Sequence, residues 1–408
     1  MKPRSESSNS FLYRLLLFTL LLFAEPGSAS SEEVVLRMQD GAQTEVTSLS
    51  WDKDSIQFKT ASGDLDALPR EQLKAISFRR PYSRKVTESI GLQLTNDDIY
   101  FVSDLLLTEE RFLAKFDDQD ISIPIEYVRE VFFDVCVTNL KESAVDPGSD
   151  DVVILKNQDV VRGELDSFDD DKINFKTDLG SLKLPRSNSR SIKLNPALAA
   201  DIPIAAKHAQ LFLKNGSVLS TMPSTNMNEF DLSKEKLNVE LPETGTLSIL
   251  MSDICRIEFW DERHRLLNRD QPLRSHNEDY FGNIISFSQN RNASGQLLLS
   301  GDQFFSHGYG VRSQSELIFA VPSNAEALIY SVGLDDRADK NGAVDVHISL
   351  DDVEVSSHRL SQTDSHFLEH SALPIHGQKS LKLSVRFGLR GDVGDCVNWC
   401  QPYFLLRE

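Results

Sequence analysis

Two nine-residue stretches in separate parts of this chain are almost identical. Residues 52–60 read DKDSIQFKT, and residues 169–177 read DDDKINFKT. Both begin with acidic residues, alternate apolar and polar side chains, and are followed by a glycine, at Gly63 and Gly180. Alternation with a period of two is typical of a half-buried β-strand, and the glycine marks a turn after it. A chain that repeats such a unit is expected to fold as a series of small β-modules.

An eleven-residue phrase closes each repeat and occurs four times. Its first, ninth and eleventh positions are always apolar, as in Leu68, Ile76 and Phe78 of the first copy. The last two of these positions lie two residues apart, which places them on one face of a strand. The copies are LPREQLKAISF at residues 68–78, IPIEYVREVFF at 123–133, LPRSNSRSIKL at 184–194 and ILMSDICRIEF at 249–259.

Four β-repeats are therefore predicted in the first two thirds of the chain. Strand-like runs such as VVLRM and VVILK open the repeats, and turn-forming residues usually follow them. This spacing of short strands and turns resembles that of Sm-like and SH3-like small barrels. Because a fold does not fix a function, we interpret the repeats as spacer or protein-contact modules. The predicted repeats occupy residues 31–80, 88–135, 151–195 and 208–260, with linkers at residues 136–150 and 261–280.

Residues 1–30 are typical of a secretory signal peptide. Basic residues precede the apolar run LLLFTLLLFA at residues 15–24, and small residues follow it. This run is too short for a bilayer core, which requires about 20 apolar residues, and no other run in the sequence is long enough. We therefore expect a secreted protein, periplasmic or extracellular, without a membrane span.

Charge and motif content narrow the range of functions. The formal net charge is −19, and the sequence has no basic stripe with interleaved aromatic residues, so nucleic acid is not an expected partner. The sequence contains no Gly-x-Ser-x-Gly elbow and no P-loop. HFLEH at residues 366–370 formally fits an inverted zinc-protease pattern, but that pattern requires a helix and this segment is expected to be strand or loop. We expect no enzymatic activity and no required cofactor.

The last third of the chain has more glycines and aspartates and longer alternating strands. Four stretches characterise it, namely FFSHGYGVRSQSEL at residues 304–317, VGLDDRADKNGAVDVHISLDD at 332–352, LKLSVRFG at 381–388 and GDVGDCVNW at 391–399. In order and spacing they resemble the NPCBM family, which comprises carbohydrate-binding modules attached to glycoside hydrolases. The resemblance implies that residues 281–408 form a β-sandwich that binds glycans, with galactose-containing sugars as the best-known ligands and often with a structural calcium ion.

The predicted fold class is therefore all-β, with tandem small β-barrel-like repeats followed by a jelly-roll β-sandwich. The predicted function is that of a secreted, non-catalytic protein that binds a glycan through the C-terminal sandwich. The repeats would act as spacers or would contact protein partners. The alternative is an extracytoplasmic scaffold protein in which the sandwich mediates protein contacts and binds no sugar.

Sugar binding requires an apolar plate for the pyranose ring and planar hydrogen-bonding groups for its hydroxyls. Residues of these types in the family-like stretches are Tyr309, Arg312, Asn398 and Trp399, and they are the candidate glycan-binding residues. Trp399 could instead close the core of the sandwich, since large aromatic residues are mostly buried. Arg312 could instead form a surface ion pair, for example with Asp335 or Asp395.

Two departures from the family pattern affect this site. Arg312 stands where the family commonly has a histidine after Gly-x-Gly-Val. Residues 395–399, DCVNW, stand where it has Asp-His-Ala-Asp/Asn-Trp. Two histidines that could contact a ligand are therefore replaced, so the resemblance implies the fold but not the particular sugar.

The same loops contain candidate residues for a metal ion and for a disulfide. Asp335, Asp336 and Asp395 offer the oxygen atoms that calcium prefers, although paired aspartates are also ordinary turn residues. Cys396 and Cys400 could form a disulfide across a bend. In a fully extended strand, however, residues i and i+4 stand too far apart for this bond.

Overall fold

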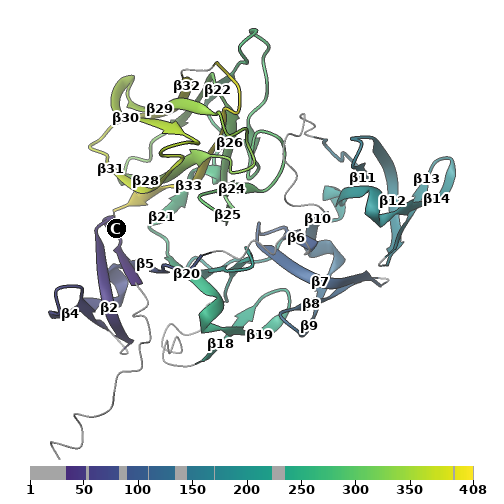
Figure 1. Cartoon of the computed structure of the whole chain (residues 1–408), viewed down its shortest axis with the longest axis horizontal. Helices are drawn as coiled ribbons and strands as arrows, with labels where there is room; N and C mark the ends of the chain where they lie inside the picture. The colour runs from purple at the N-terminus through teal and green to yellow at the C-terminus, as the bar shows by residue number, and fades with distance from the viewer. Residues whose placement is uncertain are drawn as a thin grey trace, which may run out of the picture.

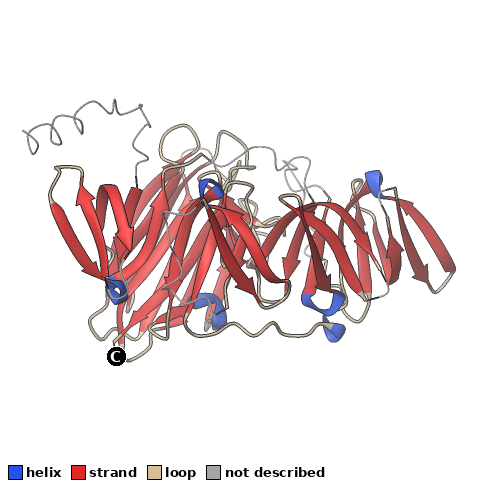
Figure 2. Ribbon diagram, turned by 90° about the horizontal axis from the view of Figure 1, so that it is seen from below, coloured by secondary structure: helices blue, strands red, loops and turns tan. Residues whose placement is uncertain are grey.

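A computed structural model describes residues 34–51, 55–81, 90–108, 110–133, 145–169, 171–222, 235–388 and 391–407. The predicted signal peptide and most of the predicted linker at residues 136–150 lie outside these ranges. The described chain consists of β-strands joined by turns and by 3-10 helices of three residues, as Figure 2 shows. The all-β prediction is confirmed. None of the helices in these ranges has the length and apolar character needed to cross a bilayer.

The first unit shows how the repeated sequence produces strands. Ile56 and Phe58 are buried while Gln57 and Lys59 between and after them are exposed, as a period of two requires. Gly63 adopts a φ of 95° in the following turn, a conformation that favours glycine. The strands of this unit are β1 (Val34–Met38), β2 (Gln43–Trp51), β3 (Ser55–Thr60), β4 (Leu65–Pro69) and β5 (Leu73–Phe78).

The strands of this unit pair in the order β4-β3-β2-β1-β5. The 3-10 helix η1 (Arg70–Gln72) connects β4 to β5. Among the described residues of the unit, no pairing joins β4 to β5 and closes the ladder. The described strands of the unit therefore form an open sheet and not a closed barrel.

Three further units have the same succession of five strands, each with a short 3-10 helix before its last strand. The second and third units also repeat the pairing order, whereas the third and fourth strands of the fourth unit form a separate two-stranded sheet among the described residues. The second contains β6 (Ile90–Leu94), β7 (Ile99–Leu107), β8 (Arg111–Phe116), β9 (Gln119–Pro124) and β10 (Val128–Phe132). The third contains β11 (Asp151–Leu155), β12 (Val160–Phe168), β13 (Lys172–Thr177), β14 (Gly180–Pro185) and β15 (Ser189–Lys193). The fourth contains β16 (His208–Leu213), β17 (Val218–Ser220), β18 (Lys236–Leu241), β19 (Gly245–Leu250) and β20 (Ile254–Trp260).

The units associate mainly through their last strands. β5 of the first unit pairs antiparallel with β20 of the fourth, and β10 of the second pairs antiparallel with β15 of the third. One further pairing connects β17 to β7. The spatial order is therefore first, fourth, second and third, and the units form a row in Figure 1.

The ninth position of the repeated phrase lies at both junctions between last strands. Ile76 stands opposite Ile257, and Val131 stands opposite Ile192. All four side chains are fully buried in one hydrophobic cluster that extends through the four units. Burying a side chain of this size contributes roughly 1.5–3 kcal/mol. The repeated apolar pattern thus forms the core of each unit and also the junctions between units.

Two facing sheets form the C-terminal sandwich, with an apolar core between them. The first sheet has the order β23 (Ser288–Gln289), β26 (Gly308–Arg312), β33 (Cys396–Leu406), β28 (Ala325–Leu334) and β31 (Phe367–Pro374). The second has the order β22 (Arg274–Asn277), β27 (Ser315–Ala320), β32 (Ser380–Phe387), β29 (Ala343–Leu350) and β30 (Val353–Ser361). The predicted β-sandwich is present.

The segment at residues 261–280, which we expected to be a linker, belongs largely to the sandwich. Its strand β21 (His264–Leu266) pairs with β33, and β22 pairs with β27. Both strands are short and largely polar, and Arg265 of β21 forms an ion pair of 2.8 Å with Asp270, which follows the strand. Strands of three or four residues are too short to show a period of two in the sequence. The sandwich therefore begins well before Phe281.

The sandwich packs on the second and fourth units, as Figure 1 shows. An apolar cluster at this junction includes Phe101 and Phe212 of the units and Leu297 and Phe304 of the sandwich. Polar contacts accompany it, such as the hydrogen bond of 2.7 Å that Arg291 Nη2 donates to Glu130 Oε2. The repeats and the sandwich are thus joined by buried apolar and polar contacts.

Candidate functional site

A polar pocket opens at the end of the sandwich where β26 ends and β33 begins. Its volume is about 250 Å³. Arg312 is the last residue of β26 and stands opposite Cys396, the first residue of β33. We call this cavity the rim pocket. Its lining includes Asn292, Gln296, Arg312, Asp335, Arg337 and Asp339.

Asp335 is the centre of the hydrogen bonds beneath the rim pocket. Arg337 donates to both of its carboxylate oxygens, from Nε at 2.9 Å and from Nη2 at 2.8 Å. Asn292 and Asn398 each donate to Asp335 Oδ2 at 3.0 Å. Burial alone would raise the pKa of Asp335, but the charge of Arg337 and these hydrogen bonds hold it below its ordinary value. Asp335 is therefore an ionised carboxylate that fixes the pocket floor.

Of the four predicted glycan-binding residues, only Arg312 lines this pocket. Trp399 has an exposed fraction of 0% and packs against Tyr330 in the sandwich core, with ring centroids 6.0 Å apart. Tyr309 is also buried, and its hydroxyl donates to the carbonyl oxygens of Leu267 and Asp270 at 3.1 Å. The expectation that the two rings form an exposed plate is corrected, because both face the core. Asn398 is likewise buried, beneath the pocket.

The three predicted calcium ligands do not converge on one point. Asp336 accepts hydrogen bonds from the backbone N–H groups of Gly301 and Asp302, while Asp395 accepts them from Ser313 Oγ and the N–H of Ala343. Burial raises the pKa of both carboxyl groups to about 6. Within the described ranges, no group of three acidic, histidine or cysteine side chains is placed to share a metal ion.

Cys396 and Cys400 are free thiols, which corrects the predicted disulfide. Both belong to the single strand β33 and not to a bend. A strand rises about 3.3 Å per residue, so their Cα atoms stand roughly 13 Å apart, whereas a disulfide requires about 4.4–6.8 Å. The extended geometry of β33 therefore excludes the bond.

The exposed aromatic surface at this end of the sandwich comes from residues that our sequence analysis did not select. Tyr280 and Phe281 have exposed fractions of 60% and 84%, and their ring centroids lie 5.8 Å apart. Tyr280 also packs edge-on against Phe387 of β32. Hydrogen bonds from Asn283 lower the pKa of neighbouring Asp279, and the charge of Arg312 adds to this effect. The aromatic pair thus lies on a loop close to Arg312.

The sequence did contain a signal for this loop. Residues 279–282 read DYFG, which places two aromatic side chains in a turn closed by a glycine. Gly282 has a φ of 83°, and its N–H donates to the carbonyl oxygen of Asp279. Aromatic residues in a turn have no opposite strand to pack on, so they commonly remain exposed. We missed them because the segment lay at the edge of the predicted linker.

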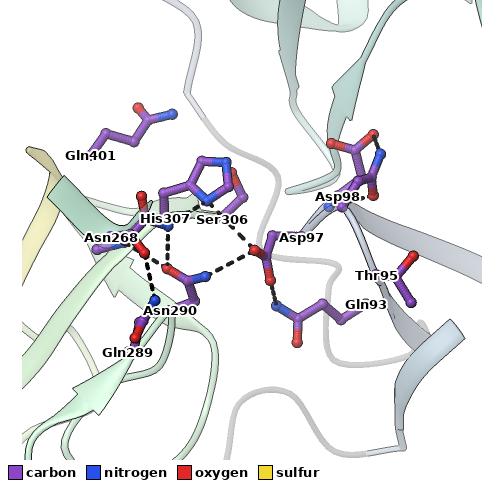
Figure 3. Close-up of polar contacts among 12 residues, drawn as sticks. Gln93, Thr95, Asp97, Asp98, Asn268, Gln289, Asn290, Ser306, His307 and Gln401 are labelled. Carbon is purple, nitrogen blue, oxygen red and sulfur yellow. Dashed lines mark hydrogen bonds and ion pairs between the residues drawn. The ribbon is translucent and has the colours of Figure 1, made fainter. Parts of the chain in front are cut away.

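A chain of polar contacts joins the sandwich to the second unit at the opposite end of β26. Asn290 Nδ2 donates to Asp97 Oδ2 at 2.9 Å, and Asn290 Oδ1 accepts from Asn268 Nδ2 at 2.9 Å. Asn268 Nδ2 also lies 3.0 Å from His307 Nδ1, as Figure 3 shows. Gln93 continues the chain by donating to Asp97 Oδ1 at 3.3 Å. These contacts fix the orientation of the sandwich on the repeats.

Residues 268–405 match the model of the family described as NPCBM/NEW2 domain, which agrees with the resemblance in the sequence. This part of the protein is therefore similar to NPCBM/NEW2 domains. The matched residues include most of the sandwich and none of the four repeat units. No curated protein matches the chain.

Similar solved structures include carbohydrate-binding modules of two bacteria. CBM51 from Clostridium perfringens GH95 in complex with methyl-galactose is 16% identical, with a TM-score of 0.30, over 35% of this chain and 99% of that chain. The CBM51-2 and INT domains of Clostridium perfringens ZmpB are 20% identical, with a TM-score of 0.31, over 41% of this chain and 35% of that chain. The tandem CBM51 modules of Sp3GH98 from Streptococcus pneumoniae are 11% identical, with a TM-score of 0.31, over 63% of this chain and 88% of that chain.

Proposed function

We propose that the C-terminal sandwich binds a glycan at the rim pocket, with Tyr280 and Phe281 as its apolar plate. The observation that carries this proposal is the exposed pair of rings on a loop whose Asp279 carboxylate feels the charge of Arg312. Exposed aromatic side chains in contact with each other leave apolar surface in water, and they bury it when a ligand packs on them. The family match of residues 268–405 supports a sugar as that ligand.

The rim pocket has the chemistry for one sugar residue. Pyranose rings present C–H faces to aromatic rings, while the guanidinium of Arg312 and the carboxamides of Asn292 and Gln296 suit vicinal hydroxyls. The pocket volume of about 250 Å³ is below the range of about 300–1,000 Å³ that drug-sized ligands occupy. A terminal monosaccharide unit therefore fits better than a long chain. We propose galactose-terminated glycans as the first ligands to examine.

The role of this site is binding and not catalysis. Asp335, the most buried carboxylate of the pocket, is held ionised by Arg337, so it has no proton to donate to a leaving group. Residues 366–370 fit the zinc-protease pattern, but His366 precedes strand β31 and the other four residues lie in it, so they do not form the helix that this chemistry needs. We further propose that the protein is exported and that the repeats support the sandwich.

Calcium is not required in this proposal. The carboxyl groups of Asp335, Asp336 and Asp395 each accept hydrogen bonds from protein donors, so their oxygen atoms already have partners. A calcium ion would have to compete with those donors for the same oxygen atoms. Addition of a chelator should therefore leave both glycan affinity and thermal midpoint unchanged.

A glycan array probed with the intact protein tests the proposal. Tyr280→Ala, Phe281→Ala and Arg312→Ala should each weaken binding by about 1–3 kcal/mol, or roughly fivefold to 150-fold. Val353→Ala and Arg359→Ala are matched controls, because both side chains are exposed on β30, away from the rim pocket. Parent-like binding by all three rim variants would refute the rim assignment. Absence of any retained glycan would favour the scaffold alternative.

A further inference from the structure

A second and larger cavity lies between the sandwich and the repeats. Its volume is about 740 Å³, which falls within the range of about 300–1,000 Å³ that is typical of ligand sites. We call it the interdomain cleft. Its walls include Asp97 and Arg129 of the second unit, His208 and Trp260 of the fourth unit, and Asn268 and Arg269 of the sandwich.

The cleft exists only because the two parts of the protein are held together. Figure 3 shows Asn268, Asn290 and His307 of the sandwich on one side and Asp97 of the second unit on the other. Nearby, the side chains of Gln401 and Gln210 share a hydrogen bond of 2.7 Å between Nε2 and Oε1. These buried contacts fix the distance between the walls. Neither the repeats nor the sandwich could form the cleft alone, because each supplies only part of its lining.

The charges around the cleft largely cancel in pairs. Arg129 forms an ion pair with Asp97, and Arg265 forms one of 2.8 Å with Asp270. Arg269 and Glu262, which are exposed at the cleft, have opposite signs. Asp261 also lines the cleft and forms an ion pair of 2.8 Å with Arg263. A cleft of this kind has no excess charge with which to attract a phosphate or a carboxylate. Its chemistry favours an uncharged ligand.

The uncharged polar groups of the walls suit hydroxyl groups. Asn268, Gln289 and Asn290 bring carboxamides to the sandwich side of the cleft. Burial lowers the pKa of His208 to about 4, so its imidazole is neutral at physiological pH. A neutral imidazole has one donor and one acceptor nitrogen, and a carboxamide likewise donates and accepts. Such groups match the hydroxyls of a sugar, which also donate and accept.

Two buried polar atoms of lining residues lack a hydrogen-bond partner among the described residues. They are Trp260 Nε1, a donor, and Asn268 Oδ1, an acceptor. Trp260 has an exposed fraction of only 6%, and leaving a buried donor unsatisfied costs about 1–3 kcal/mol. Both residues line the cleft. A ligand hydroxyl can satisfy both a donor and an acceptor of this kind.

We propose that the interdomain cleft is a second glycan-binding site, which takes a short neutral oligosaccharide. It lies at the opposite end of β26 from the rim pocket, because His307 precedes that strand and Arg312 ends it. The site goes beyond binding by the sandwich alone, since the second and fourth units supply part of its wall. The repeats would therefore act in ligand recognition and not only as spacers.

The test uses the intact protein, with the rim pocket disabled by Phe281→Ala and Arg312→Ala. Ala206, an exposed residue of the cleft wall, is changed to tryptophan to fill the cavity. Ala199→Trp is the matched control, because Ala199 is exposed but does not line the cleft. The probes are an array of neutral, sialylated and sulfated oligosaccharides, followed by calorimetric titration of the best neutral binder.

The rim-disabled protein should retain at least one neutral oligosaccharide, with one site per chain. Ala206→Trp should weaken this binding at least tenfold, and Ala199→Trp should not. Arg269→Gln, which keeps a polar side chain at the exposed edge of the cleft, should reduce it only a few-fold. Equal binding by the Ala206→Trp and Ala199→Trp proteins would overturn the proposal. Retention of sialylated or sulfated probes alone would also overturn it, because the ligand would then be anionic.

The two proposals can fail separately. If the rim-disabled protein binds no glycan while the parent does, the cleft proposal is wrong and the rim proposal stands. If the rim substitutions change nothing while Ala206→Trp removes binding, the rim proposal is wrong and the cleft is the glycan site.

Discussion

The ammonium nitrogen of Lys74 lies 3.4 Å from the centroid of the Trp260 ring, in the buried junction of the first unit, the fourth unit and the sandwich. It also faces the ring of Tyr403 at 4.9 Å and donates a hydrogen bond of 3.0 Å to the carbonyl oxygen of Phe259. These aromatic faces and the carbonyl oxygen stabilise a cation. Complete burial opposes them and lowers the pKa of Lys74 to about 7.

The free energy of unfolding should therefore rise with pH above about 7. The ordinary pKa of Lys74 is 10.5 and its folded value is about 7, so between these values the unfolded chain binds the additional proton. Below pH 7 both states carry the proton, and the folded state bears the full cost of burying the charged Lys74. This cost disappears as the pH approaches 10.5. Glu258 and Asp261 raise the pKa of Lys74, while Arg37 and Arg256 lower it, and all four face the same junction. The slope contributed by Lys74 is at most about 1.4 kcal/mol per pH unit.

Chemical denaturation at several pH values between 7.5 and 9.5 measures this slope. Lys74→Met keeps a long apolar side chain but removes the titrating group, so its stability should depend less on pH in that interval. Identical slopes for the parent and Lys74→Met would show that Lys74 is not the group responsible.

Substitution of Trp399 should affect folding and not the surface of the rim pocket. Trp399 is fully buried between the sheets, so Trp399→Ala should lower the free energy of unfolding by roughly 3–5 kcal/mol. Tyr280→Ala removes a ring that is mostly exposed and should cost less than about 1 kcal/mol. Urea denaturation of both variants measures the difference. A Trp399→Ala protein as stable as its parent would place this ring outside the core.

The sequence predicted the repeated strands well because their signal is local. The ninth-position residues alternate with polar neighbours, and that period reveals a buried face without knowledge of the partner. Which units become neighbours was not predictable in the same way. The pairing of Ile76 with Ile257 joins the first unit to the fourth, and nothing within either phrase distinguishes that partner from the other two. Such pairing depends on contacts between residues distant in sequence.

The site was only partly predictable, for a geometric reason. Tyr309 and Arg312 lie in one strand, an odd number of positions apart, so a period of two places them on opposite faces. Tyr309 stands opposite Trp399, and residues directly opposite each other in a sheet point to the same side. Both rings therefore enter the core while Arg312 lines the pocket. All three residues were selected by residue type alone. The face of the sheet that each one occupies depends on its position along the strand.

Cys255, Cys396 and Cys400 should all react as thiols after denaturation without a reducing agent. The extended strand β33 keeps the last two apart, and burial raises the pKa of Cys255 to about 11 and that of Cys400 well above its ordinary value. In the native protein, Cys400 should therefore react slowly with iodoacetamide. Peptide mass spectrometry of protein alkylated in denaturant, with and without prior reduction, checks the prediction. A peptide pair linked through Cys396 and Cys400 would contradict it.

Packing of the sandwich on the repeats should depend on Gly216. This residue has a φ of 91°, and a Cβ added to it would lie 2.8 Å from Phe304 of the sandwich and 2.9 Å from Phe101 of the second unit. Gly245 has a similar φ of 80°, but a Cβ there would meet nothing within 4 Å. Gly245→Ala should therefore cost about 1–2 kcal/mol through backbone strain alone. Gly216→Ala should cost a further 1–3 kcal/mol, roughly, because the rings must move.

Hydrogen exchange separates a loosened junction from a general loss of stability. β25 (Gln303–Phe305) carries Phe304 against the units, so its amides should exchange faster in Gly216→Ala than in Gly245→Ala. The amides of β29, which lies in the five-stranded sheet of the sandwich and not in the two-stranded sheet that contains β25, should exchange at similar rates in the two variants. Equal unfolding free energies and equal exchange in β25 would mean that Phe304 does not pack closely on the units. In that case the sandwich would not be held in one orientation, and the interdomain cleft would lose its fixed walls.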